Sequence, residues 1–471
     1  MNVNWGNKYN SRALIFSVLI IIIHLLLFPN YIMEIPVLVM GVTIIFWFYF
    51  SLTSYFRKWE SSAGFRQKLF LHSLIYRIIA IIGVYCLTYF YDPYNLPMEI
   101  GAADGWNYHY SGELVSKTLK EGRNVFTALS GYWKNETDYG FSIYLGVVYY
   151  YLGPSIILIK LLNAVFGSIT AIRVYQIATL IYSEKKARQA AILFMLFPPL
   201  LWFSAMYLKE TILIFLIVNS SYYILKITHQ PEKGIKFVGL LLVSLIPLYY
   251  FRLFLIPLII IAAAIHFFFY FSVAKKNKFL IRFSFILISI GIFFVLRKFN
   301  MLEKIYELSN QGSTAFSNEL TNSAIQRGVS YKQALIAPFI LLGSIITPFP
   351  SLINFDENQF GIYMHYQNEI VRNAMYFFVF TGMYCALKNR ARNMAYIFSF
   401  AVGYIMILAL SGVSFQDRFQ LLALPFLIFF IPIGLDWQHK KKLKFWEIYL
   451  FVITIAILSW NIFKLSIRGL V

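Results

Sequence analysis

Long uncharged runs recur along the whole chain and constrain its fold more than any other feature. Examples are "ALIFSVLIIIIHLLLF", which begins at Ala13, and "LFLIPLIIIAAAIHFFFYF", which begins at Leu253. A helix of about 20 apolar residues crosses a bilayer, and helices satisfy their own backbone hydrogen bonds inside lipid. We therefore expect an all-α, polytopic membrane protein.

The apolar runs divide into about 13 predicted transmembrane helices. They lie near residues 13–31, 36–55, 69–91, 156–182, 188–205, 207–226, 237–251, 253–273, 279–296, 370–387, 394–412, 420–435 and 446–465. A further apolar segment, 334–354, ends in Pro348 and Pro350. A full crossing there would invert every later loop, so we expect it to be re-entrant or interfacial.

The positive charge predicts the orientation of these helices. Only 13% of the 471 residues are charged, yet the net charge is +20. The basic residues cluster in short loops, such as "RKWESSAGFRQK" at 57–68, "SEKKARQ" at 183–189 and "KNRARN" at 388–393. Short basic loops are typical of the cytoplasmic side, and the absence of a basic soluble domain argues against nucleic acid as a partner.

This orientation leaves two large loops on the outer face, at 92–155 and 297–369. The chain then divides into two additional N-terminal helices (1–60), a core that carries the first outer loop (61–296), the second outer loop (297–369) and C-terminal helices (370–471). Cys86 and Cys385 both lie in apolar runs and fit neither a disulfide framework nor a zinc spacing.

The first outer loop holds the stretch "AADGWNYHYSGE", in which Asp104 begins an amphipathic segment. Asp104 is expected at the membrane rim with Tyr108 one helical turn later on the same face. A carboxylate there could accept a proton from an incoming nucleophile, although Asp is also a favoured helix N-cap. His109 and Glu113 form a second pair with this spacing, so a divalent metal is possible.

Isolated charged residues or adjacent pairs of them mark three other predicted outer turns. Lys209 and Glu210 interrupt about forty apolar residues, Arg252 stands alone in "YYFRLF", and Arg418 follows Asp417 before an apolar span. Hydration at a hairpin turn, snorkelling to headgroups and pairing between neighbours are the structural alternatives. A guanidinium also suits a phosphate group through paired hydrogen bonds. No nucleotide-binding or common hydrolase motif occurs.

Taken in order, these features resemble the GT-C superfamily of polytopic glycosyltransferases, in the bacterial branch of protein mannosyltransferases and aminoarabinose transferases. The matching stretches are "AADGWNYHYSGE", the aromatic helix "YGFSIYLGVVYYYLG", "LFPPLLWFSAMYLKE" and "DRFQLLALPFLIFF". The resemblance covers roughly 92–260 and 394–435. Many family members have two adjacent acids in the first loop, whereas Gly105 follows Asp104 here.

The resemblance implies a polyprenyl-phosphate-linked sugar donor and a glycan, lipid or protein acceptor at the outer face of the cell membrane. Asp104 would be the catalytic base, and Glu210 a supporting acid or a ligand of the acceptor. Lys209, Arg252 and Arg418 would neutralise the leaving lipid phosphate, with Tyr108, His109 and Tyr139 as further substrate-binding residues. Inversion at the anomeric carbon is expected.

Two alternatives remain open at the level of sequence. An O-antigen or capsule-type polymerase or ligase also uses lipid-linked glycans and would place its main outer loop in the second half of the chain. A flippase of lipid-linked sugars would place charges near the middle of the membrane; only Arg77 and Lys160 lie within apolar runs in that way.

Overall fold

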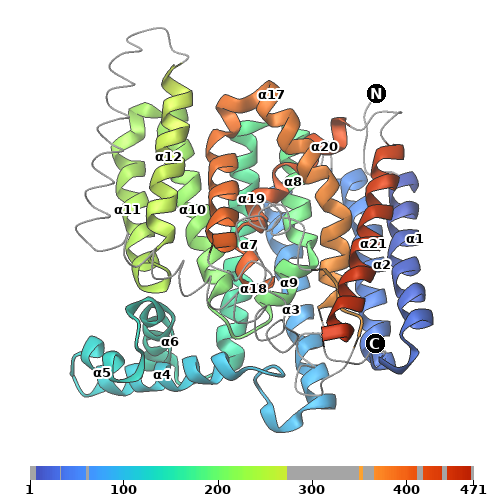
Figure 1. The fold of residues 1–471 in the computed structure, drawn as a ribbon. Helices are drawn as coiled ribbons and strands as arrows, with labels where there is room; N and C mark the ends of the chain where they lie inside the picture. Colours follow the sequence, from blue (N-terminus) through green and yellow to red (C-terminus); the bar gives the residue numbers. More distant parts are fainter. Residues whose placement is uncertain are drawn as a thin grey trace, which may run out of the picture. The chain divides into compact units, whose positions relative to one another are not determined.

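The computed structural model describes residues 7–31, 33–59, 63–272, 349–353, 365–410, 417–437 and 443–467. Within these ranges the regular elements are helices (Figure 1). The all-α prediction is therefore confirmed for the described part of the chain. The chain forms two compact units, one of Met1–Tyr49, Ile260–Phe355 and Tyr366–Val471, the other of Phe50–Ile259 and Asp356–His365.

The first unit contains helices from both ends of the chain. They are α1 (Asn7–Leu27), the first part of α2 (Ile35–Lys58), the end of α12 (Leu255–Ser272), α17 (Tyr366–Leu410), α18 (Asp417–Gln420), α19 (Leu424–Ile428), α20 (Ile431–Trp437) and α21 (Leu443–Ile467), with the short η1 (Pro29–Tyr31). Polar side chains join helices distant in sequence: the Trp446 indole donates to the carbonyl of Ala374, and the Tyr366 hydroxyl donates to that of Leu38.

Helix α17 differs from its sequence prediction. Residues 370–387 and 394–412 were expected as two spans joined by the basic loop "KNRARN", but the helix continues through that stretch as 45 residues. Two apolar segments, Tyr366–Asn389 and Arg392–Leu408, lie on either side of it, and Figure 1 draws them as two limbs meeting at a bend. Lysine and arginine are good helix formers, so the helical conformation continues through the basic stretch.

The second unit contains the first outer loop and the spans around it. Its helices are the end of α2, α3 (Phe65–Tyr91), α4 (Ala103–Lys120), α5 (Val125–Tyr132), α6 (Tyr139–Leu152), α7 (Ile156–Ile181), α8 (Glu184–Leu196), α9 (Pro198–Ser204), α10 (Glu210–His229), α11 (Gly234–Phe251) and the start of α12, with η2 (Pro93–Asn95), η3 (Glu136–Asp138) and η4 (Pro231–Lys233). The predicted outer loop 92–155 is thus largely helical. Figure 1 shows α4 running across the direction of the spans α7, α10 and α11 at one of their ends.

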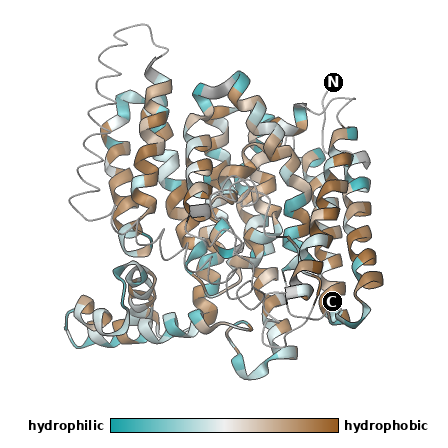
Figure 2. Cartoon of the chain, in the orientation of Figure 1, coloured by the Kyte–Doolittle hydropathy of each residue, from teal (hydrophilic) through white to brown (hydrophobic). Residues whose placement is uncertain are grey.

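Among the described residues, eight helices are long and apolar enough to cross a membrane, or nine if α8 and α9 form one span. Figure 2 shows these helices mostly brown and α4 with more teal. These lengths and compositions identify a multi-pass membrane protein. Of the predicted spans, only 279–296 lies wholly outside the described residues, as does most of the segment 334–354. The total of about 13 stays a prediction.

The span predicted at 188–205 is broken in the structure. Helices α8 and α9 meet at an angle of 49°, and Phe197 between them is extended with ψ 116° because it precedes Pro198. Proline disfavours the helical conformation in the residue before it. The short helix α9 is buried along its length and leads into the turn that carries Lys209.

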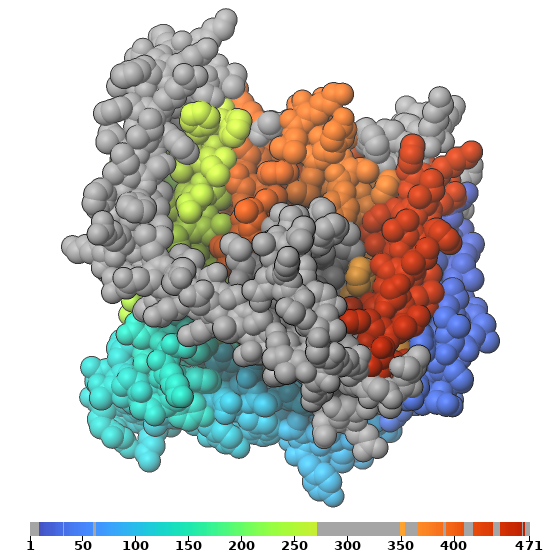
Figure 3. Space-filling model, in the orientation of Figure 1, coloured from blue at the N-terminus to red at the C-terminus, as the bar shows by residue number. Residues whose placement is uncertain are grey.

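Helices α4 and α6 pack closely through small residues. Ser111 and Gly112 of α4 face Ser142 and Gly146 of α6, and the two serine hydroxyls hydrogen-bond at 2.7 Å. Small residues four apart let helix backbones approach. Figure 3 shows residues of α4–α6, in cyan and teal, as one continuous block of surface. This contact fixes the position of Tyr108, one turn before Gly112.

Replacing Gly146 with alanine is expected to destabilise this packing. The new Cβ would lie 2.2 Å from Cγ1 of Val115 and 3.2 Å from the carbonyl oxygen of Gly112. Overpacking costs about 1–3 kcal/mol, which outweighs the helix-propensity gain of about 1 kcal/mol for Gly→Ala. Gly83→Ala is the matched control, because nothing lies within 4 Å of its new Cβ. Equal thermal midpoints in detergent for the two variants would contradict the packing account.

Candidate functional site

Two ion pairs from distant parts of the second unit form one charged cluster. Lys209 Nζ lies 2.6 Å from Oδ1 of Asp138, and the Tyr108 hydroxyl donates to the same oxygen at 3.1 Å. The Lys209 ammonium also lies 5.4 Å from the centroid of the Tyr108 ring. Next along the chain, Glu210 Oε1 is 3.7 Å from a guanidinium nitrogen of Arg252. We call these five residues the Lys209 cluster.

Helix ends bring the Lys209 cluster together. Asp138 is the N-cap of α6, Lys209 the N-cap of α10, and Arg252 the C-cap of α11. Helices α10 and α11 are consecutive and pack against each other, so the beginning of α10 and the end of α11 lie at the same end of the pair. Helix α11 also contacts α6 and η3, which adds Asp138 to that end.

The cluster is largely withdrawn from solvent. Lys209, Glu210 and Arg252 are buried, whereas 28% of the Asp138 side chain remains accessible. Burial lowers the pKa of Lys209, and the nearby charge of Arg252 acts in the same direction, while Asp138 and Glu210 raise it. Buried charges are stable only when opposite charges and hydrogen bonds compensate their lost hydration. The alternation of cations and carboxylates provides that compensation.

Asp104 lies in the first turn of α4 and is exposed, but it is not the helix cap. The N-cap is Ala102, which makes no side-chain capping bond. The capping alternative for Asp104 is therefore wrong, although a carboxylate in the first turn still interacts favourably with the helix dipole. Tyr108 follows one turn later on the same face and reaches Asp138, so α4 connects Asp104 with the Lys209 cluster.

The remaining candidates occupy other surroundings. Tyr139 is buried against Val115 and Leu129, in the packing between α4, α5 and α6. His109 contacts the Tyr149 hydroxyl through Nδ1 at 2.8 Å and Glu113 through Nε2 at 3.5 Å. Burial lowers the pKa of His109, while Glu113 raises it. Arg418 lies in α18, in the first unit, and its share in a common site stays a prediction.

Asp138 was not singled out from the sequence. It stands in "KNETDYGF" among other polar residues, where an acid is ordinarily a solvated loop residue. The available signal was its place at the start of the aromatic helix "YGFSIYLG", one residue before Tyr139. Its pairing with Lys209, 71 positions later, depends on tertiary structure.

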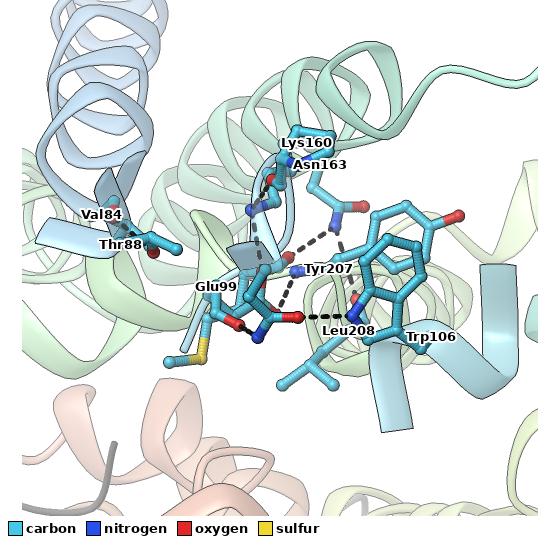
Figure 4. Close-up of polar contacts among 11 residues, drawn as sticks. Val84, Thr88, Glu99, Trp106, Lys160, Asn163, Tyr207 and Leu208 are labelled. Atoms are coloured by element: carbon cyan, nitrogen blue, oxygen red, sulfur yellow. Dashed lines mark hydrogen bonds and ion pairs between the residues drawn. The ribbon is translucent and has the colours of Figure 1, made fainter. Parts of the chain in front are cut away.

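A third ion pair, outside the Lys209 cluster, explains Lys160. Its ammonium lies 2.8 Å from Glu99 Oε2 and donates to the carbonyl of Pro97 at 3.2 Å (Figure 4). Arg77, the other charge within an apolar run, donates to the carbonyl of Ser73 at 3.2 Å and lies 5.8 Å from the ring of Phe194. Lys160 is therefore part of an internal network between α7 and the loop before α4.

Within the described residues, no three His, Cys, Asp or Glu side chains are arranged to hold a metal ion. The His109–Glu113 pair has no third ligand of these types in that part of the chain. A divalent metal remains a prediction from the sequence alone.

Comparison with known proteins yields no match: no protein-family model, no curated protein and no solved structure is similar to this chain.

Proposed function

We propose that the protein is a membrane glycosyltransferase of the GT-C type, which transfers a sugar from a polyprenyl-phosphate donor to an envelope acceptor on the extracytoplasmic face. The observation that carries this proposal is the pair of buried cations, Lys209 and Arg252, at one end of the spans. Two cations in poorly hydrated surroundings suit a phosphate held at the edge of the bilayer.

The charge distribution supports the outer side for this cluster. Basic residues occupy the opposite ends of the spans in this unit: Lys68 at the start of α3, Lys185 and Lys186 in the first turn of α8, and Lys226 in the last turn of α10. Cytoplasmic loops carry an excess of lysine and arginine. The Lys209 cluster lies at the other ends, where α10 begins and α11 ends.

Exposed aromatic residues support a position at the membrane surface. Tyr89 and Phe90 project at the end of α3, Tyr150 and Tyr151 at the end of α6, and Tyr249 at the end of α11. Tyrosine is enriched where the acyl chains meet the headgroups. A donor whose lipid lies in the bilayer would present its phosphate and sugar at this level.

The proposed reaction follows from these charges. An acceptor hydroxyl oxygen bonds to the anomeric carbon, the bond from that carbon to the phosphate oxygen breaks, and the lipid phosphate leaves with one more negative charge. Lys209 and Arg252 stabilise that charge, and cations already in place do so without reorganisation cost. Asp104 takes the acceptor proton, because it is exposed at the rim and one turn from Tyr108. Glu210 keeps Arg252 in place.

Asp104→Asn is expected to lower the maximal rate about 10²–10⁴-fold, the usual contribution of a general base, with little change in the donor KM. Asp138→Asn is the comparison, because Asp138 contacts Lys209 and should chiefly alter the donor KM. Both rates are measured at saturating acceptor. A wild-type rate in Asp104→Asn would rule out Asp104 as the base.

Purified protein in lipid vesicles, offered a panel of polyprenyl-phosphate-linked hexoses and pentoses, tests the function itself. Release of lipid phosphate together with sugar transfer to an extracted envelope glycan is the expected result. If the wild-type protein consumes no donor but moves it between leaflets, it is a flippase and the enzyme proposal fails. Chain growth from oligosaccharide donors would instead indicate a polymerase.

A further inference from the structure

A network of buried side chains holds the turn that precedes α10. Glu99 Oε1 accepts the backbone N–H of Tyr207 at 2.9 Å, and the Asn163 amide donates to the carbonyls of Met206 and Leu208 at 3.4 Å each (Figure 4). Lys160 pairs with the second Glu99 oxygen at 2.8 Å. Glu99, Lys160 and Asn163 are all at most 5% exposed. We call them the turn network.

The turn needs these partners because it lies between two helices. Helix α9 ends at Ser204 and α10 begins at Glu210, and backbone groups at helix ends lack partners within the helix. Unmet buried polar groups cost free energy. Lys160 and Asn163 are three residues apart on α7, so both project from one helix face. Asn163 contacts the turn directly, and Lys160 contacts Glu99, which accepts the N–H of Tyr207.

A hydrogen bond that holds the Leu208 carbonyl also restricts the backbone of Lys209. The carbonyl of Leu208 and the N–H of Lys209 belong to one peptide group, which is planar. When the Asn163 amide holds that carbonyl, it sets the direction from which the Lys209 side chain departs toward Asp138. Contacts at 206, 207 and 208 therefore restrict the backbone from which the Lys209 side chain extends toward Asp138.

The same network reaches α4. The Trp106 indole donates to Asn95 Oδ1 at 2.6 Å, and the Asn95 amide donates to the carbonyl of Glu99 at 2.9 Å. Trp106 lies between Asp104 and Tyr108 on α4. The elements that carry the proposed base and the phosphate-binding lysine are thereby joined through Glu99.

Resting on the proposed function, we infer that Glu99, Lys160 and Asn163 are positioning residues, which hold Lys209 where the donor phosphate binds. They act through the turn and not by touching the substrate.

The test replaces Asn163 with leucine, which is similar in size but cannot hydrogen-bond. Full-length protein in lipid is treated with a small amine-acylating reagent across a pH series, and modification of Lys209 is followed by mass spectrometry. Loosening the turn should hydrate the ammonium, so the apparent pKa of Lys209 should rise toward that of an ordinary lysine. Donor turnover should fall about 10²-fold, the usual cost of misplacing a catalytic contact.

Asn219→Leu is the matched control. It removes another buried asparagine bond, from Asn219 to Ser244 Oγ at 3.2 Å, in the interior of α10. This variant should leave both Lys209 labelling and turnover as in the wild type. If Asn163→Leu does not fold, Asn163→Ala removes the same two bonds without placing an apolar group against the carbonyls.

The labelling result separates this inference from the proposed function. Unchanged labelling of Lys209 in the Asn163 variants overturns the positioning role, whatever the activity. A shift of the same size in the apparent pKa of Lys209 in Asn219→Leu also overturns it. The shift would then follow the loss of any buried asparagine bond. If labelling shifts only in the Asn163 variants while the wild type transfers no sugar, the proposed function fails and the positioning of Lys209 stands.

Discussion

Replacing Lys209 with methionine is expected to lower donor turnover about 10²–10³-fold, the usual cost of removing one preplaced electrostatic contact to a developing charge. Methionine keeps most of the length of the side chain, so its packing beside the Tyr108 ring is largely retained. Initial rates of lipid phosphate release, measured with protein in vesicles, give the effect.

Two further variants sharpen this prediction. Lys209→Arg keeps the charge and should retain more activity than Lys209→Met. Lys226→Met removes a lysine from the opposite end of the same helix, where it lies over the ring of Tyr222, and should match the wild type. If Lys209→Met and Lys226→Met have equal rates, Lys209 does not contact the leaving phosphate.

The largest expected effect on stability is that of Lys160→Met. This change leaves Glu99 charged and buried without its ammonium partner at 2.8 Å. Removing one member of a buried ion pair costs about 3–5 kcal/mol, whereas replacing both members is often close to neutral. Thermal midpoints in detergent should therefore fall sharply for Lys160→Met and recover in the double variant Glu99→Gln, Lys160→Met.

The double variant retains an oxygen at residue 99 that can accept the N–H of Tyr207. Lys117→Met is the control for loss of a lysine, because Lys117 is exposed on α4 and exposed substitutions usually change stability by no more than about 0.5 kcal/mol. Failure of the double variant to recover would mean that the pair itself, and not the stranded charge, stabilises the unit.

Several site features were predictable because they are local properties of the chain. Lys209, Glu210 and Arg252 are charged residues at turns between apolar runs, and the structure brings all three together. The break in the span 188–205 was less apparent, although Pro198 and Pro199 are its direct cause. Asp is a favoured N-cap type, but the helix register makes Ala102 the N-cap and places Asp104 in the first turn.

Asp138 and Glu99 could not be assigned in the same way. Asp138 is an ordinary acid in a polar loop, and Glu99 stands alone between Met98 and Ile100. Each acquires its role from a partner elsewhere in the fold, Lys209 or Lys160. Sequence also left Lys160 unexplained, since a lysine in an apolar run has no visible counter-ion until the loop before α4 folds back onto α7. Residues 61 or 71 positions apart in the sequence form these pairs because helix packing brings them together.

The sequence by itself determined that the described chain is helical and multi-pass, because hydrophobic length and short basic loops act on each segment separately. Only the tertiary structure decided which charges meet. The start of α6, the start of α10 and the end of α11 converge. A charge buried there needs an opposite charge within a few ångströms. That convergence depends on contacts such as Gly140 of α6 with the Phe251 ring of α11, whose effect no single segment reveals.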